Sequence, residues 1–271
     1  MMAPTTKPFQ AFWACVKGCA IHTLVSTEPS RTKPSEFYVP DIVLVHGLGV
    51  SARYLLPTAE RLAAHFRVWI PELPGFGDSG RPDRVLNIPE MADCLRDWLD
   101  RVGLTRAVFL GNSLGCQVIV DLAVRYPQCV ESAVLVSPTM DPRTRTIPWQ
   151  IWHAFRDLCR EPWSLWPIVA RDYLATGIRR LYVTLRYSLQ DPIESKLPLM
   201  KVPTLVIRGG RDTIIPQAWV EEMVALLPEG RLVVIPHGTH ALNFSCSEEL
   251  TQEVGKFQAS LVGIRSSSQA S

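Results

Sequence analysis

The chain has 271 residues, of which 47% are hydrophobic and 20% charged, and its formal net charge is +2. This length suits one α/β unit with one sizeable core, and the composition excludes a disordered or fibrous chain. The nearly balanced charge predicts no nucleic-acid partner. Seven scattered cysteines show neither a disulfide pattern nor metal-ligand spacing, so we expect no metal and a reducing, cytoplasmic location.

The N-terminal segment 9–25 is apolar, but Lys17 and His22 interrupt it and no cleavage motif follows. We therefore expect a β-hairpin with strands at 11–16 and 19–25, and not a signal peptide. A polar connector follows at 26–40. No window holds 18 uninterrupted apolar residues, so the sequence predicts no membrane span.

Strands and helices alternate through most of the remaining chain. Short apolar runs predict strands at 42–45, 67–70, 107–110, 132–136, 204–207 and 232–235. Apolar residues at helical spacing predict helices at 51–66, 88–102, 118–126, 218–227 and 248–261. This order indicates βαβ units with right-handed crossovers, and hence an α/β fold whose central sheet is mostly parallel with helices on both faces.

One long segment, 138–200, carries no strand pattern. It holds tryptophans and tyrosines on helix-like stretches that prolines divide. We expect a helical cap here, inserted into a core formed by 1–137 and 201–265. The low-complexity end, 266–271, is expected to be a flexible tail.

The sequence GNSLG at 111–115 follows a predicted strand and opens a predicted helix. This G-x-S-x-G pattern in that context is typical of a serine on a strained strand-to-helix turn, where glycines on either side avoid collisions. The N–H groups and positive dipole end of the helix would favour an oxyanion nearby. Ser113 is therefore the candidate nucleophile.

Candidate acid and base residues follow two later strands. Asp212 comes after the strand at 204–207, within the sequence GGRDTIIP, and two histidines follow the strand at 232–235. We prefer His240 to His237 because it lies farther from the strand end, in a loop with room to reach the sheet edge. The resulting order Ser, Asp, His is shared by the triads of α/β-hydrolases.

Five motifs together carry a family resemblance. They are HGLG at 46–49, PGFGDSGRP at 74–82, GNSLG at 111–115, GGRDTIIP at 209–216 and HALNF at 240–244. In this order the chain resembles the α/β-hydrolase superfamily over nearly its whole length. The resemblance implies the α/β-hydrolase fold and an enzyme that needs no cofactor.

The resemblance also implies a role for individual residues. Ser113 would be the nucleophile, His240 the general base, and Asp212 the group that orients the imidazole. The backbone N–H groups of Leu48 and Leu114 would form the oxyanion hole. A serine at this turn argues against the branches whose nucleophile is an aspartate.

Within the superfamily, HGLG and GNS are similar to the branch of small-molecule esterases and meta-cleavage-product hydrolases, which cut a carbon–carbon bond. The C–C hydrolases usually carry a tryptophan directly after the histidine, and this chain has Ala241 there. We therefore expect a carboxylic ester hydrolase. A C–C hydrolase and a non-turnover ligand-binding protein remain alternatives.

The expected substrate is a small to medium ester with an apolar acyl or aryl group. Across 138–197 there are eight arginines and one lysine against six acids, which favours an anionic group on the substrate, although each arginine also suits a solvated helix face. A homodimer remains open. The expected substrate-binding residues are Gly47, Gly49, Asn112, Trp152, Arg179, Arg186 and Ile214.

Overall fold

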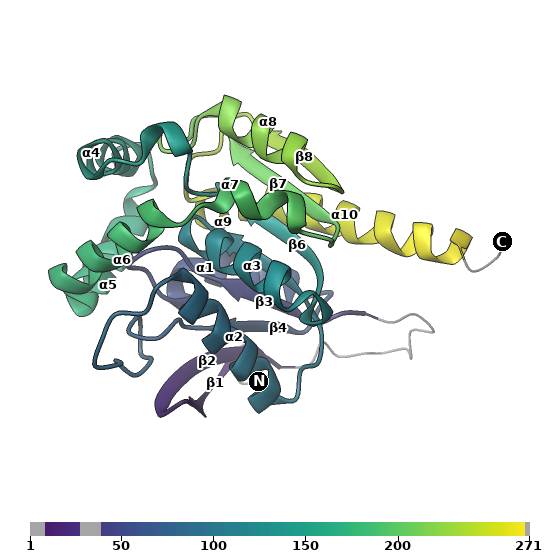
Figure 1. Cartoon of the computed structure of the whole chain (residues 1–271), viewed down its shortest axis with the longest axis horizontal. Helices are drawn as coiled ribbons and strands as arrows, with labels where there is room; N and C mark the ends of the chain where they lie inside the picture. Colours follow the sequence, from purple (N-terminus) through teal and green to yellow (C-terminus); the bar gives the residue numbers. More distant parts are fainter. Residues whose placement is uncertain (1–8, 28–38, 269–271) are drawn as a thin grey trace, which may run out of the picture.

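The structure is a computed structural model that describes residues 9–27 and 39–268 (Figure 1). Most of the polar connector expected at 26–40 lies outside these residues. The sheet has eight strands in the order β1-β2-β4-β3-β5-β6-β7-β8; β3 to β8 pair in parallel, and β2 is antiparallel to both of its neighbours, β1 and β4. Their bounds are β1 Phe9–Val16, β2 Cys19–Ser26, β3 Ile42–Val45, β4 Val68–Pro71, β5 Ala107–Asn112, β6 Val130–Val136, β7 Thr204–Gly209 and β8 Gly230–Ile235.

The N-terminal hairpin is confirmed, with β1 and β2 paired antiparallel from Phe9 with Ser26 to Val16 with Cys19. Lys17 and Gly18 form the turn with φ of 48° and 79°. Two positive φ angles are what a two-residue hairpin turn of type I′ requires, and they match the twist of the strands.

Helices cover both faces of the sheet, as expected for an α/β fold (Figure 1). On one face the buried residues of α2, α3 and α8 pack against the strands, and on the other those of α1, α9 and α10 do so. The bounds are α1 Ala52–Leu62, α2 Ile88–Val102, α3 Leu114–Arg125, α8 Gln217–Leu226, α9 Leu242–Ser245 and α10 Ser247–Ser268.

Three predicted helix boundaries were wrong. Helix α1 ends at Leu62 and not at 66, because the chain turns from Ala63 onward. Helix α3 begins at Leu114 and not at 118, because the helix starts directly at the serine turn. Helix α10 continues to Ser268, so the tail expected from Ser266 is helical over its first three residues. Residues 269–271 lie outside the described residues.

The segment 138–200, which we call the cap, contains helices and no strand. Its helices are α4 Ile147–Leu158, α5 Trp166–Thr176, α6 Ile178–Gln190 and α7 Ile193–Lys196. In Figure 1, α4, α5 and α6 gather at the left, at the opposite end of the molecule from the last turns of α10. None of the helices in the described ranges is long and apolar enough to cross a bilayer.

Candidate active site

Ser113 lies on the turn between β5 and α3, with φ of 54° and ψ of −118°. This is a sparsely populated backbone conformation for a residue other than glycine, so the surrounding packing must hold it. A Cβ on Gly111 would lie 2.6 Å from Ile119, and one on Gly115 would lie 2.3 Å from the carbonyl oxygen of Val45. Both glycines of the motif are therefore required by the close approach of α3 to the strands.

The HGLG loop follows β3 and packs against this turn. A Cβ on Gly47 would lie 3.3 Å from the Cβ of Ser113, so the loop backbone contacts the serine directly. Leu48 comes next in the loop. Leu114 is the first residue of α3, and its N–H has no acceptor within the helix.

His46 sets the position of this loop. The side chain is fully buried, with Nδ1 2.8 Å from the carbonyl oxygen of Gly47, and its Nε2 accepts a hydrogen bond from the N–H of Leu73 at 2.9 Å. Burial lowers the pKa of His46, in spite of the hydrogen bond to Gly47. A neutral imidazole that donates from Nδ1 and accepts at Nε2 satisfies both contacts.

His240 and Asp212 meet at the carboxyl ends of β8 and β7. Nδ1 of His240 lies 3.0 Å from Oδ2 of Asp212. The other carboxylate oxygen of Asp212 accepts the N–H groups of Ile214 at 2.8 Å and Ile215 at 2.9 Å. Burial opposes ionisation of Asp212, but the charge and hydrogen bond of His240 outweigh it and hold the pKa of this carboxyl below its usual range.

Ile214 was expected to bind substrate. The structure gives its backbone a different contact, because the N–H of Ile214 fixes the carboxylate of Asp212. The half-buried side chain packs against the core.

Asn112 was also expected to contact substrate, and the structure gives its side chain a role within the protein. The residue is buried, and its Oδ1 accepts a hydrogen bond from the hydroxyl of Tyr54 at 3.0 Å. Its Nδ2 lies 3.4 Å from the carbonyl oxygen of Val136 and 3.2 Å from that of His240. The amide therefore joins the serine turn to the histidine loop, and its polar atoms are used within the protein.

Two buried carboxylates of the cap hold the same histidine loop. Asp157, near the end of α4, accepts the N–H of His240 at 3.2 Å and that of Thr213 at 3.1 Å. Glu161 accepts the N–H of Ala241 at 2.8 Å. Neither residue was predicted from the sequence, because acids within an arginine-rich helical segment resemble solvated surface charges.

These carboxylates change the proton affinity of the site. Burial alone would lower the pKa of His240, but Asp212, Asp157 and Glu161 surround it and raise the pKa to about 9. Burial raises the pKa of Glu161 to about 7, against the lowering by the N–H of Ala241. The pKa of Asp157 is also raised, chiefly by burial.

Three cap residues were expected to contact the substrate, but their side chains face outward. Trp152 is 58% exposed on α4, and Arg179 and Arg186 are exposed on α6. The inward-facing arginine of this helix is Arg180, which donates to the carbonyl oxygen of Pro82 at 3.2 Å. These predictions failed because the basic excess of the cap says nothing about which face of a helix carries it.

Gly49 lies where the cap meets the HGLG loop. Its φ is 78°, and a Cβ there would lie 2.5 Å from Leu181 and 2.7 Å from the ring of Tyr173. The α5–α6 pair therefore rests on the loop beside Ser113, as the end of α4 rests on the loops of Asp212 and His240.

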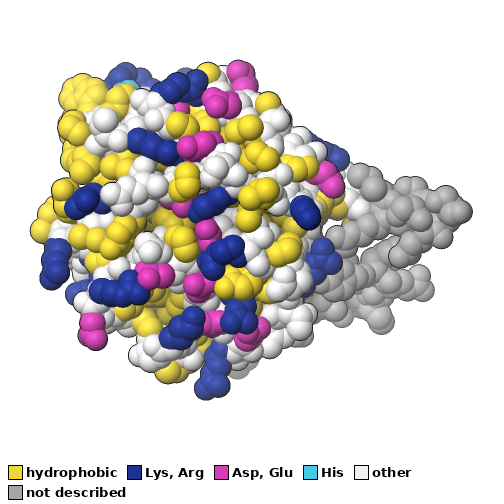
Figure 2. Space-filling model, in the orientation of Figure 1, with side chains coloured by type: hydrophobic (Ala, Val, Ile, Leu, Met, Phe, Trp, Pro, Cys, Tyr) yellow, Lys and Arg dark blue, Asp and Glu magenta, His cyan; other side chains and the backbone are white. Residues whose placement is uncertain are grey.

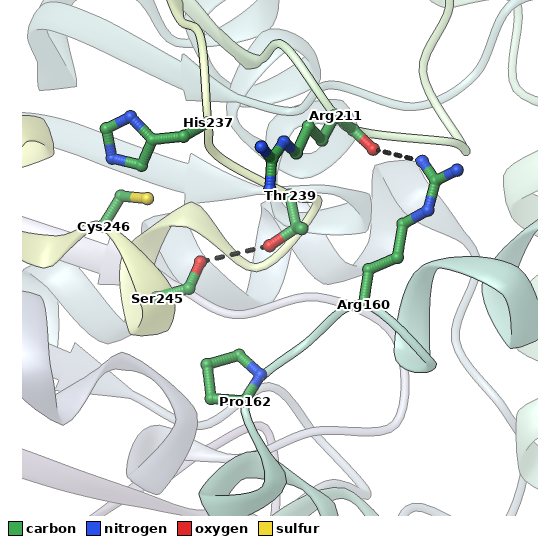
Figure 3. A pocket seen from close by; sticks show the side chains of 7 residues that line it. All are labelled: Arg160, Pro162, Arg211, His237, Thr239, Ser245 and Cys246. Atoms are coloured by element: carbon green, nitrogen blue, oxygen red, sulfur yellow. Dashed lines mark hydrogen bonds between the residues drawn. The ribbon is translucent and has the colours of Figure 1, made fainter.

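A cavity of about 560 Å³ opens beside the histidine loop, outside the Asp212–His240 pair. Figure 3 shows Arg160 of the cap at one side of it, where it donates to the carbonyl oxygen of Arg211, 3.0 Å away. His237 is exposed at its edge and lies 3.1 Å from Glu249. The structure thus separates the two histidines, and His240 alone of the two contacts Asp212.

A parallel sheet with a strained serine after one strand, an acid after a second and a histidine after a third defines an α/β-hydrolase. The sequence pattern of the alpha/beta hydrolase family matches residues 42–253. The chain belongs to this family, which is one of hydrolytic enzymes.

Individual relatives support an enzyme of the hydrolase class. RutD of Yersinia enterocolitica, which has the provisional name of a carbamate hydrolase, is 29% identical over 77% of this chain and 83% of its own. The pimeloyl-[acyl-carrier protein] methyl ester esterase of Nitrosomonas europaea is 29% identical over 78% and 92%. The solved enol-lactonase of Burkholderia xenovorans superposes with a TM-score of 0.74 at 21% identity, over 92% of this chain and all of that one.

Proposed function

We propose that this protein hydrolyses carboxylic esters through an acyl-enzyme on Ser113. One observation carries the proposal: the strained serine turn is tied by Asn112 to the loop whose histidine bonds Asp212 at 3.0 Å. A serine is a weak nucleophile unless a base is placed beside it, and a base is reliable only when a third group orients it. The three loops supply these parts at one edge of the sheet.

In the proposed cycle, Oγ of Ser113 attacks the acyl carbon and His240 accepts the proton. The oxyanion is held by the N–H groups of Leu48 and Leu114, and the alcohol leaves with the proton from His240. His240 then takes a proton from water, whose oxygen attacks the acyl carbon; the bond to Oγ breaks, Ser113 regains the proton from His240 and the carboxylic acid is released. Asp212 stabilises the imidazolium in both halves of the cycle.

An ester substrate is favoured over a carbon–carbon bond by two observations. Ala241 follows the histidine, and its N–H is bound by Glu161. The Nitrosomonas europaea relative is named as a methyl ester esterase, and the superposed Burkholderia protein as an enol-lactonase. We propose an acyl or aryl group of small to medium size; the outward arginines give no support to a carboxylate clamp.

Hydrolysis of p-nitrophenyl esters from acetate to decanoate by the wild type and Ser113→Ala tests this function. The proposal predicts turnover that the variant loses by at least about a thousandfold, because the covalent route is closed. His240→Ala should lose activity to a similar extent, and His237→Ala should retain it. Turnover that survives in Ser113→Ala would overturn the proposal.

A further inference from the structure

Large apolar side chains are exposed mainly on the cap. Among the described residues, twelve such side chains are exposed, and nine of them belong to 138–200. Three protrude almost completely, with exposures of 82% for Trp163, 84% for Leu174 and 83% for Ile178. Soluble monomers seldom expose apolar side chains in one region to this extent, so we infer that this region contacts a partner.

Seven of these nine side chains lie on α4, α5 and α6, at one end of the molecule. Helices α4, α5 and α6 gather there in Figure 1, and Figure 2 shows hydrophobic side chains along the same edge with basic groups among them. Ile178 and Tyr182 are one turn apart and form an apolar stripe on α6. Trp152 and Phe155 form a second apolar group on α4, with ring centroids 6.4 Å apart.

The charge of this surface has one sign. Five of the six acidic residues of 138–200 are buried, and the sixth, Glu194, is half-buried and paired with Arg145. By contrast, six arginines of the segment are exposed. Five of these have no carboxylate within ion-pair distance in the described part of the chain, and they are Arg156, Arg160, Arg171, Arg179 and Arg186. Of the five, Arg160 donates to the carbonyl oxygen of Arg211.

We propose that this surface of the cap, formed by Trp152, Phe155, Trp163, Leu174, Ile178 and Tyr182 with the neighbouring arginines, docks on an anionic lipid bilayer. Protruding Trp, Leu and Ile side chains enter the boundary of the acyl chains, while arginines bind anionic headgroups. A second copy of the chain fits this surface poorly. A two-fold contact would place its unpaired arginines against those of the partner.

Docking would bring the site to the membrane. The α5–α6 pair that carries Leu174 and Ile178 also rests on Gly49, beside Ser113. The proposal goes beyond ester hydrolysis and does not depend on it, because Ser113→Ala should bind vesicles as the wild type does. Loss of turnover and loss of docking are therefore measured separately.

Co-sedimentation with vesicles tests the docking. We expect the full chain to bind vesicles of equal parts phosphatidylcholine and phosphatidylglycerol, and to bind pure phosphatidylcholine at least about tenfold less. The variant Leu174→Ser with Ile178→Ser should lose about tenfold or more in partition coefficient, since two protruding apolar side chains are removed. Arg179→Gln with Arg186→Gln should lose about tenfold and lower the salt dependence.

Matched controls lie elsewhere on the chain. Trp13 on β1 is 58% exposed, as Trp152 is, so Trp13→Ala should bind vesicles normally while Trp152→Ala binds less. Arg106→Gln removes an exposed arginine far from the cap in sequence and should have no effect. Because all these side chains are exposed, the variants should fold, which circular dichroism checks.

Four results would overturn the proposal. The first is wild-type protein that stays in solution with anionic vesicles, and the second is binding that both double variants keep. The third is a dimer in light scattering that Leu174→Ser with Ile178→Ser dissociates, which would make a second copy the occupant. Retention on polyglutamate without vesicle binding would identify an acidic polypeptide as the occupant and would overturn it as well.

Discussion

The side-chain amide of Asn112 donates a hydrogen bond to the backbone carbonyl oxygen of His240, 3.2 Å away. These residues are 128 positions apart, and each stands at a functional position: Asn112 directly precedes Ser113, and His240 bonds Asp212. The contact therefore fixes the distance between the loops of the proposed nucleophile and base. It gives a buried, non-reacting side chain a positioning role.

Asn112→Ala should lower kcat by about tenfold or more with little change in KM, because a misplaced base slows the proton transfer from Ser113 more than it weakens substrate binding. The variant should also lose about 1 to 3 kcal/mol of unfolding free energy, since the hydroxyl of Tyr54 loses its acceptor. Ester kinetics and urea denaturation measure the two effects.

Asn87→Ala is the matched control for that experiment. Asn87 caps α2 through a hydrogen bond from the N–H of Glu90, so its loss costs about 1 kcal/mol of stability. It should leave kcat unchanged. A kcat for Asn112→Ala equal to that of Asn87→Ala would remove the positioning role.

The pH profile should reflect the acids around His240. Only neutral imidazole can accept the proton of Ser113, so kcat/KM should rise with pH until it passes the pKa of His240, about 9. Asp157→Asn keeps a hydrogen-bond acceptor but removes a negative charge that raises this pKa. The rising limb should then move to lower pH by about one unit.

Asp191→Asn is the control for the charge effect. Asp191 is likewise a buried acid of the cap, but it contacts Lys196 and Gln117 and not the histidine loop. Its replacement should leave the limb in place. Titration of the His240 imidazole by NMR gives the same comparison without turnover, and equal pKa values in the wild type and Asp157→Asn would contradict the prediction.

Gly115→Ala should destabilise the fold by about 3 kcal/mol, because the new Cβ would lie 2.3 Å from the backbone oxygen of Val45 and α3 would have to move. Gly255→Ala is the opposite case. Gly255 lies within α10 with open space around its Cα, so alanine should add about 0.5 to 1 kcal/mol by helix propensity. Chemical denaturation measures the change in unfolding free energy of both variants. Equal changes would show that steric contact of the new Cβ does not determine their size.

Glu72→Ala should cost about 3 kcal/mol of unfolding free energy, because the buried carboxylate is bound on several sides. It accepts the N–H groups of Ala52 at 2.9 Å and Asp78 at 2.6 Å, and lies 2.9 Å from Nδ1 of His22. Glu90→Ala, which removes a more exposed pair with Arg84, should cost about 1 kcal/mol or less. Similar losses in the two variants would show that burial of the Glu72 network adds little.

The sequence predicted the sheet and the Ser113 turn because local patterns carry both. Buried parallel strands read as short apolar runs, and the glycines around Ser113 are forced by backbone contacts that no other residue permits. The Asp212–His240 pairing followed from chain order. Helix ends were less well predicted, since α10 continues past the last apolar turn.

The cap was the part that sequence could not resolve. Its composition predicts helices, but not which face of each helix packs on the core. Arg179 was expected inside and lies outside, whereas Asp157 and Glu161 looked like surface charges and are buried against backbone N–H groups. Such contacts depend on tertiary packing. The net charge of a segment does not show which of its charged side chains are buried.

The most direct test of the account is mass spectrometry of the intact protein after reaction with a fluorophosphonate, followed by peptide mapping. We expect one adduct, located on Ser113, with labelling slowed at least about a hundredfold in His240→Ala and abolished in Ser113→Ala. An unlabelled wild type, or an adduct on another residue while Ser113 stays free, would contradict the central claim that Ser113 is the nucleophile.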